Sequence, residues 1–258
     1  MKRFISFSGG VESTAMCVLY GKGATAIVAD TGSEHKKMYE RLDYIEKMLK
    51  IYHNDDFELV RVKGKQVVKG EVVDSLTDYI LRSNFFPSAR KRFCTARFKI
   101  EPIDDYLSKQ GPCKLLIGFN ADEEHARTGN YLKCKNVYYR YPLIEDGYNR
   151  DYCEDLLEEL GLHPNFPAYM ARGGCKFCPF KSKKEFRAMV HLAPAEIEEC
   201  AIIEKSIQDS RNKYFRIRTN MPPLSQFIEI EKNNLFGDNS PFYSDDYLTK
   251  SCGPFCHR

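Results

Sequence analysis

The sequence lacks tryptophan and any long hydrophobic run, and only 12 of its 258 residues are proline. A membrane helix needs about 18 consecutive apolar residues, whereas the apolar stretch that follows residues 1–3 stops at the glycines of residues 9–10. We therefore expect no membrane segment, no secretory leader and a cytoplasmic protein. Hydrophobic residues make up 43% and charged residues 29% of the chain, which excludes wholesale disorder and the collagen-like and low-complexity classes.

The sequence also lacks a strong charge of one sign. Its formal net charge is +3, and the whole excess lies in residues 171–258, which hold 14 Lys and Arg against 11 Asp and Glu. That balance suits phosphate-bearing partners, although many solvated surfaces share it. Because nothing in the sequence directs export, the ten cysteines are expected to be reduced thiols and metal ligands rather than disulfides.

Short apolar segments alternate with amphipathic ones in the first two thirds of the chain. The patterns predict strands over residues 3–8, 24–30, 57–62, 114–119 and 137–143, and helices over residues 13–19, 36–51, 72–81 and 149–160. This order predicts an α/β fold, a doubly wound and mostly parallel sheet with helices on both faces. We expect a nucleotide-binding domain over residues 1–165, and over residues 166–258 a small helical, Cys-rich region with a four-Cys metal site.

A glycine-rich turn follows the first predicted strand and opens a helix: Ser8-Gly9-Gly10-Val11-Glu12-Ser13-Thr14. Glycines at such a place let backbone N–H groups and the helix N-terminus face an anion. The turn lacks the Lys of a P-loop and the spacing of the dinucleotide fingerprint. A plain strand-to-helix turn with a serine cap explains the same residues, so the turn alone leaves both interpretations open.

Four segments together resemble one family, the PP-loop ATP pyrophosphatase and phosphoadenylyl-sulfate (PAPS) reductase superfamily. The turn is similar to that family's Ser-Gly-Gly-x-Asp-Ser loop, with Glu12 in place of Asp. The segment Asp30-Thr31-Gly32-x-Glu34 resembles the one that closes the second strand in the PAPS reductase branch. Residues 92–102 resemble Arg-x-Cys-Thr-x-x-x-Lys-x-x-Pro, and residues 118–127 resemble Gly-x-Arg-x-x-Glu-Ser-x-x-Arg with Asn120 and Glu124 replacing Arg and Ser.

The resemblance implies an adenine-nucleotide site on one rim of the sheet, because each segment lies at the carboxyl end of a predicted strand or carries cations toward it. A solvated loop would explain the basic run of residues 90–99 equally well if it stood alone. The implied catalytic candidates are Ser13, Lys99 and Cys252. The implied nucleotide-binding residues are Ser8, Gly9, Gly10, Val11, Glu12, Ser13, Thr14, Asp30, Thr31, Gly32, Arg92, Arg97, Lys99, Gly118, Asp122, Glu123 and Arg127.

Two close cysteine pairs stand far apart in the sequence. Cys175 and Cys178 form C-x2-C, and Cys252 and Cys256 form C-x3-C, which is the usual layout of a four-thiolate site for Zn²⁺ or a [4Fe–4S] cluster. Such a site would hold the tail against the helical region. Resemblance to one reductase branch also makes Cys94 an alternative ligand and Cys252 an alternative tail nucleophile, while a redox dithiol is a further interpretation. We favour the ligand pair because it explains both tail cysteines.

Two reactions fit these residues. In the first, ATP with Mg²⁺ adenylates an acceptor, pyrophosphate leaves into the turn, and sulfur displaces AMP; nucleic-acid thiolation, with a nucleic-acid acceptor and a sulfur donor protein, is the natural example. In the second, PAPS or adenylyl sulfate is reduced through thiolate attack. Both glycines, Glu12 and the paired tail cysteines favour the first. A third interpretation is a non-catalytic nucleotide- or nucleic-acid-binding module with structural zinc.

Overall fold

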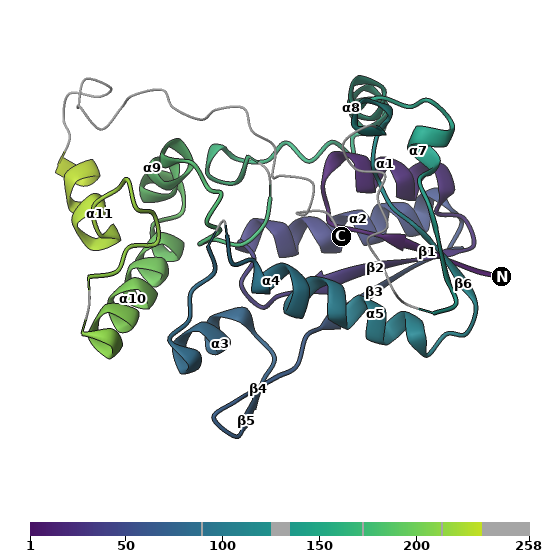
Figure 1. Cartoon of the computed structure of the whole chain (residues 1–258). Coiled ribbons are helices and arrows are strands. Elements are labelled where there is room, and N and C mark those ends of the chain that lie inside the picture. The colour runs from purple at the N-terminus through teal and green to yellow at the C-terminus, as the bar shows by residue number, and fades with distance from the viewer. Residues whose placement is uncertain (89, 125–134, 172, 213, 234–258) are drawn as a thin grey trace.

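The structure is a computed structural model, and it describes residues 1–88, 90–124, 135–171, 173–212 and 214–233. Its centre is a five-stranded sheet in the order β3-β2-β1-β6-β7, with every neighbouring pair parallel (Figure 1). The strands are β1 (Lys2–Ser6), β2 (Ala24–Asp30), β3 (Phe57–Lys63), β6 (Cys113–Leu116) and β7 (Val137–Arg140). The predicted α/β fold with a mostly parallel sheet is therefore confirmed.

Helices cover both faces of the sheet because its strands are apolar on both sides. Ile5 of β1 belongs to a buried cluster with α1 (Val11–Tyr20) and α2 (Lys36–Tyr52), whereas its neighbour Phe4 packs with α5 (Glu101–Ser108) on the other face. Successive side chains of a strand point to opposite faces, so a two-sided apolar strand is buried between two helical layers. The sheet order reverses direction at β1, and the loop after this strand is where doubly wound sheets bind ligands.

One predicted helix begins too early. Residues 72–81 were expected to be helical, but β4 (Gln66–Val68) and β5 (Glu71–Val73) pair as an antiparallel hairpin, and α3 spans only Leu76–Ser83. The hairpin turns at Lys69 and Gly70, whose φ angles are 50° and 84°. Two consecutive residues with positive φ form the tight turn that matches the twist of a hairpin.

Three helices beyond the sheet pack at the edge where its strands end. These are α9 (Lys183–Leu192), α10 (Pro194–Arg211) and α11 (Leu224–Asn233), and they gather at one end of the molecule in Figure 1. Their buried side chains, such as Phe186, Ile197 and Phe227, belong to the same apolar cluster as α1 and α2. The other helices of the described residues are α4 (Phe93–Thr95), α7 (Pro142–Glu145) and α8 (Arg150–Glu159), with short helical turns at Ala96–Ile100, Ala121–Glu123 and Ala168–Met170.

The proposed division into residues 1–165 and 166–258 stays a prediction. Buried residues from both sides of this boundary belong to the same apolar cluster. Within the described ranges, none of the helices combines the length and the apolar content that crossing a membrane requires. The tail that carries Cys252 and Cys256 lies outside the described residues.

Candidate functional site

The glycine turn (residues 8–14) joins β1 to α1. Gly10 is the N-cap of α1, and no side chain caps this helix end. The first N–H groups of a helix have no partner within it, and the helix dipole adds positive potential there. Gly9 has a φ of +77°, and a Cβ at this position would lie 3.0 Å from the Met38 sulfur, so only glycine fits. The turn therefore offers backbone donors of the kind that bind anions at helix N-termini.

Hydroxyl groups hold the turn from within. The Ser8 backbone N–H donates to Ser13 Oγ at 3.2 Å, and the two serine hydroxyls lie 3.1 Å apart. Thr14 Oγ1 donates to the Gly10 carbonyl at 2.7 Å. Ser13 and Thr14 are both buried. The predicted catalytic Ser13 consequently shapes the turn.

A buried arginine that the sequence analysis did not single out lies beneath the turn. Arg41 of α2 is 9% exposed, and its Nε donates to the Gly9 carbonyl at 2.7 Å. Its Nη2 donates to the Leu162 carbonyl at 3.0 Å and to Thr14 Oγ1 at 3.3 Å. Burial lowers the pKa of Arg41 to about 10, so the guanidinium remains protonated at neutral pH. A buried cation thus adds to the positive potential of the helix end.

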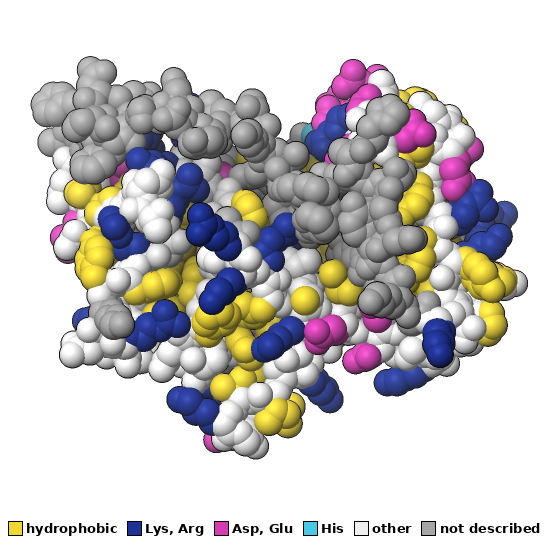
Figure 2. All heavy atoms as spheres, in the orientation of Figure 1, with side chains coloured by type: hydrophobic (Ala, Val, Ile, Leu, Met, Phe, Trp, Pro, Cys, Tyr) yellow, Lys and Arg dark blue, Asp and Glu magenta, His cyan; other side chains and the backbone are white. Residues whose placement is uncertain are grey.

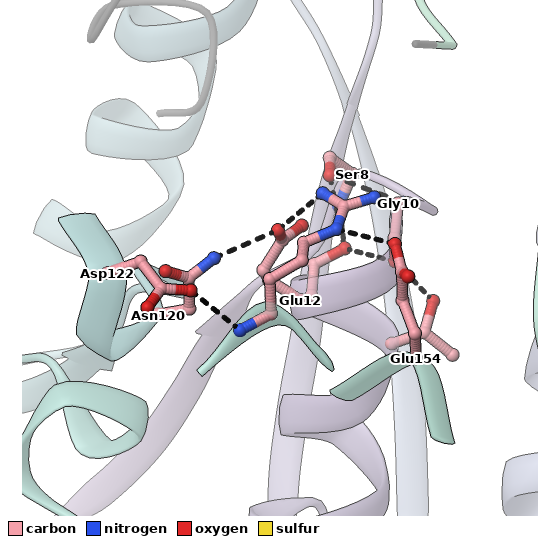
Figure 3. A network of polar contacts seen from close by, with 9 residues as sticks. Ser8, Gly10, Glu12, Asn120, Asp122 and Glu154 are labelled. Carbon is pink, nitrogen blue, oxygen red and sulfur yellow. Dashed lines mark hydrogen bonds and ion pairs between the residues drawn. The ribbon is translucent and has the colours of Figure 1, made fainter. Parts of the chain in front are cut away.

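Charged groups from three elements meet beside the turn (Figure 3). Arg150 of α8 donates from Nη1 to Glu12 Oε1 at 2.6 Å and from Nε to Glu154 at 2.7 Å. Asn120 Nδ2 donates to the same Glu12 oxygen at 3.2 Å, and the Arg150 backbone N–H donates to Asp122 at 3.1 Å. The structure therefore brings the segment containing Gly118 and Asp122 to the glycine turn. A Cβ on Gly118 would lie 3.4 Å from the Ser13 backbone nitrogen.

The carboxyl end of β2 carries a second group of predicted residues. Asp30 accepts from Tyr39 OH and from the Gly32 backbone N–H, both at 2.8 Å, and lies 3.7 Å from Lys63 Nζ. Burial and the bond to Asp30 raise the pKa of Tyr39, which keeps the phenol protonated. Gly32 has a φ of +67°, and a Cβ there would meet Ser75 Cβ at 2.6 Å.

One cavity connects the glycine turn with the cysteines. Ser8 and Gly10 line it, and Cys94, Cys175 and Cys178 also contribute to its wall. Asp30, Glu34, Tyr39, Arg92 and Lys99 line it as well. The structure therefore joins the predicted nucleotide-binding turn, the basic segment and the C-x2-C motif in a single space.

The thiols of this cavity lie among charged side chains. Cys175 Sγ donates to Glu34 Oε1 at 3.6 Å, and Thr31 Oγ1 lies 3.5 Å from the same sulfur and donates to the same carboxylate at 3.0 Å. Lys99 Nζ lies 3.8 Å from Glu34 Oε1. Burial raises the pKa of both Cys94 and Cys175, whereas the Glu34 carboxylate raises the pKa of Lys99. Glu34 Oε2 is buried without a hydrogen-bond partner in the described part of the chain.

Buried polar residues fix the C-x2-C segment to α2 and α10. Lys181 Nζ lies 3.0 Å from His35 Nε2 and donates to the Tyr169 carbonyl at 2.6 Å, and His35 Nδ1 pairs with Glu196. His35 and Lys181 are 0% and 3% exposed. The Lys181 ammonium group can only donate hydrogen bonds, so His35 Nε2 accepts from it. The proton of the His35 ring is then on Nδ1, which donates to the Glu196 carboxylate.

Several predicted residues lie elsewhere. Arg97 is exposed, its guanidinium donates to Tyr79 OH at 2.5 Å, and it does not line the cavity. Arg127, Cys252 and Cys256 lie outside the described residues. Among the residues that are described, no three His, Cys, Asp or Glu side chains are arranged to hold a metal ion. The four-Cys site and the alternative with Cys94 therefore stay predictions.

Comparison with known proteins gives one family. The sequence model of the phosphoadenosine phosphosulfate reductase domain matches residues 2–140, which hold the glycine turn, the β2 end and the basic segment. Two relatives also align with the chain. An uncharacterized protein of Methanocaldococcus jannaschii is 26% identical over 201 residues, which is 73% of this chain and 44% of that protein. An uncharacterized 37.8 kDa protein of Escherichia phage 186 is 25% identical over 252 residues, covering 79% of this chain and 74% of its own length.

Proposed function

We propose that this chain is an enzyme that uses an adenine nucleotide in a sulfur-transfer or sulfur-reduction reaction. The premise is that the chain belongs to the phosphoadenosine phosphosulfate reductase domain family within the PP-loop superfamily. The observation that carries this proposal is the cavity shared by the glycine turn and three cysteines. The family is generally enzymatic. The reaction that we favour is ATP-dependent adenylation of an acceptor followed by sulfur transfer.

The nucleotide phosphates would bind at the N-terminus of α1. The uncapped first turn offers backbone donors, and the Arg41 guanidinium beneath the Gly9 carbonyl adds a buried positive charge. Arg92 and Lys99 line the same cavity and supply further cations. Fixed donors and cations of this kind stabilise the charge that develops on a leaving pyrophosphate.

The adenylation step would be a displacement at the α-phosphorus of ATP. An acceptor oxygen forms a bond to this phosphorus, the α–β bridging bond breaks, and pyrophosphate leaves toward the glycine turn, with the Mg²⁺ of the substrate offsetting its charge. In the second step, a sulfur atom from a sulfide donor bonds to the activated acceptor carbon; where the donor is a persulfide, a second thiol then cleaves its S–S bond and forms a disulfide with the donor sulfur. The carbon–oxygen bond then breaks and AMP departs.

Sulfonucleotide reduction is the second candidate, and the thiols in the cavity favour it. A cysteine thiolate would attack the sulfur of PAPS or adenylyl sulfate, and the adenosine phosphate would leave with the bridging oxygen. A second thiol, from the chain or from a thioredoxin-like dithiol protein, would then displace sulfite and form a disulfide. Cys252, the nucleophile that the resemblance suggests, lies outside the described residues.

No step of either reaction is assigned to a metal cluster. The cavity brings together Cys94, Cys175 and Cys178, but the described thiols alone do not form a metal site. The predicted set is complete only with the tail cysteines. A cluster or zinc ion held by Cys175, Cys178, Cys252 and Cys256 would fix the tail beside the cavity.

Product analysis separates the two reactions. The purified chain is incubated with ATP and Mg²⁺ and with a total RNA or DNA acceptor pool and sulfide, and separately with PAPS or adenylyl sulfate and a dithiol donor. Adenylation predicts pyrophosphate and AMP that depend on the acceptor, and no sulfite. Sulfite formation from PAPS or adenylyl sulfate, together with no pyrophosphate from ATP, would replace the favoured reaction by the second.

Nucleotide binding without either product would support the third interpretation, a non-catalytic binding module with structural zinc.

A pair of Gly10 variants tests whether the turn binds the nucleotide. Gly10 has a φ of −80°, and a Cβ there would meet only Ser8 Oγ at 3.5 Å. Gly10→Leu should therefore keep the fold and block the turn, while Gly10→Ala serves as the smaller control. Unchanged nucleotide affinity in Gly10→Leu would overturn the assignment of the turn.

A further inference from the structure

Three stretches of the sequence contain no Asp or Glu but many cations. Residues 79–100 hold six Lys and Arg, residues 160–184 hold five, and residues 210–228 hold four. The whole chain has 36 acidic residues, so these three stretches differ in charge from the rest of it. Their positions in the fold decide whether they act separately or together.

The fold brings the three stretches side by side. The Arg211 guanidinium donates to the Asn84 carbonyl, which joins the third stretch to the first. The Arg92 guanidinium lies 5.1 Å from the centre of the Phe180 ring, which joins the first stretch to the second. Arg218 donates to the Lys181 carbonyl and closes the group. The three stretches therefore form one continuous region.

Aromatic rings alternate with these cations. Phe86 packs against Phe177 and Phe215, each with ring centroids 5.5 Å apart, and so forms an apolar base under the region. Above it, Arg216 lies 5.0 Å from the centre of the Tyr214 ring, and 69% of Tyr214 is exposed. Figure 2 shows dark blue and yellow side chains intermixed on this face, with few magenta ones.

Two acidic residues of the neighbouring helices α9 and α10 are turned inward, whereas Glu198, Glu199 and Asp209 of α10 are exposed. Glu185 and Glu204 are 6% and 2% exposed. Glu204 accepts from the backbone N–H groups of Ile217 and Leu224, and Glu185 takes part in the capping box of α9. The Glu185 and Glu204 carboxylates accept hydrogen bonds from backbone N–H groups inside the fold, so these two residues add little negative potential to the outer surface.

We infer that this basic-aromatic surface, formed by Lys91, Arg92, Phe180, Arg211, Tyr214 and Arg216, binds a single-stranded nucleic acid across the mouth of the cavity. Lys and Arg side chains pair with phosphates, and exposed aromatic rings next to guanidinium groups stack on unpaired bases. Arg92 and Phe180 also line the cavity, so a strand on this surface would pass beside the thiols. The inference deepens the proposed function by assigning the nucleic-acid acceptor a single-stranded form and a binding surface, and its last step rests on that function.

The test measures oligonucleotide binding by fluorescence anisotropy. The probes are a fluorescein-labelled single-stranded RNA, the matching DNA strand and the duplex, each titrated at several salt concentrations. The first variant is Lys91→Gln/Arg211→Gln/Arg216→Gln. Its matched control is Lys22→Gln/Lys47→Gln/Lys109→Gln, which removes three exposed lysines from the α1–β2 loop, α2 and the end of α5. The second variant, Tyr214→Ala, removes the exposed ring.

Binding should be tightest to a single strand and should weaken steeply with salt. Each phosphate contact contributes about 0.7 to the slope of log K against log salt for single strands, so the triple variant should lower that slope by about 2. Tyr214→Ala should weaken binding by about five- to a hundredfold. The lysine control should match the wild type.

Three results would overturn the inference. The first is equal binding by the wild type and the surface variant, and the second is a duplex that binds as tightly as the single strand. The third is displacement of the RNA by polyglutamate at equal charge concentration, which would indicate an acidic polypeptide as the partner. ATP affinity is measured in parallel. If the surface variant loses oligonucleotide binding but keeps ATP binding, the substitutions affect this surface alone. A wild type that binds no ATP contradicts the proposed function, but its oligonucleotide affinity still tests the surface.

Discussion

The Arg41 guanidinium donates to the Gly9 carbonyl at 2.7 Å, so a buried cation of α2 lies under the turn between β1 and α1. This contact links two elements that are separated by β2 in the sequence. It fixes the orientation of the turn's peptide groups and places positive charge next to the expected phosphates. A buried cation without a carboxylate among its hydrogen-bond acceptors costs free energy unless a ligand anion compensates it.

Arg41→Met should weaken nucleotide binding at least tenfold and lower the free energy of unfolding by about 1–3 kcal/mol, because the Gly9 and Leu162 carbonyls lose a charged donor. Arg41→Lys keeps the charge and should recover part of the affinity. Calorimetry well below the unfolding temperature separates the two effects. A purely structural arginine would leave the dissociation constant of the folded variants unchanged.

The Glu12–Arg150 pair should control how the turn accepts phosphate. Arg150→Ala leaves the Glu12 carboxylate without its closest cation, so we expect nucleotide affinity to fall several fold through repulsion. Adding Glu12→Gln removes that repulsion. A double-mutant cycle on nucleotide affinity measures this coupling. Additive effects of the two substitutions would show that the pair does not act on the nucleotide.

Stability should depend on the protonation of His35. Burial lowers the pKa of His35 below the 6.5 of an exposed imidazole, so the unfolded chain takes up this proton first as the pH falls. The contribution of His35 to the free energy of unfolding should therefore not change with pH above about 6.5. It should decrease below that value by at most about 1.4 kcal/mol per pH unit.

Urea unfolding at several pH values between 7 and 5 checks this expectation. His35→Gln cannot titrate and should show a flatter pH dependence than the wild type, although its lost contacts lower its stability overall. His191→Gln, at an exposed position of α9, is the matched control and should behave as the wild type. Equal pH slopes for wild type and His35→Gln would contradict the assignment.

Metal content tests the predicted cysteine ligands. The protein is purified without air, and iron, zinc and acid-labile sulfide are measured in the wild type and in Cys94→Ser, Cys175→Ser and Cys252→Ser. The four-Cys site predicts metal that is lost on replacing Cys175 or Cys252 but kept on replacing Cys94. Cys200→Ser, at a buried position of α10 itself, is the control. Loss on replacing Cys94 would establish it as a ligand, and a metal-free wild type would contradict the site.

The sheet and its glycine turn were predictable because local patterns determine them. The expected strand over residues 24–30 is β2, and the expected helix start at residue 36 is the start of α2. The β4–β5 hairpin was missed because its short valine-rich strands share their apolar spacing with the start of a helix. The Lys69-Gly70 pair was the available turn signal.

The contacts of Arg41, Arg150 and His35 were not predictable from the sequence. Arg150 meets Glu12 across 138 positions, and His35 meets Glu196 across 161. No local pattern encodes pairs that are brought together only when α8 and α10 pack in the folded chain. The sequence did indicate the Cys175 segment as a site, but its position beside Glu34 and Lys99 came from the fold.

Thiol alkylation in the presence of nucleotide tests the central claim, that one cavity serves both the glycine turn and the cysteines. The rates at Cys94 and Cys178, which are both half-buried, are followed by mass spectrometry with and without saturating ATP or PAPS, with the buried Cys17 and Cys113 as internal references. We predict that nucleotide slows alkylation of Cys94 and Cys178 in the wild type and has no effect in Gly10→Leu. Unchanged rates at both cysteines under saturating nucleotide would contradict the shared cavity.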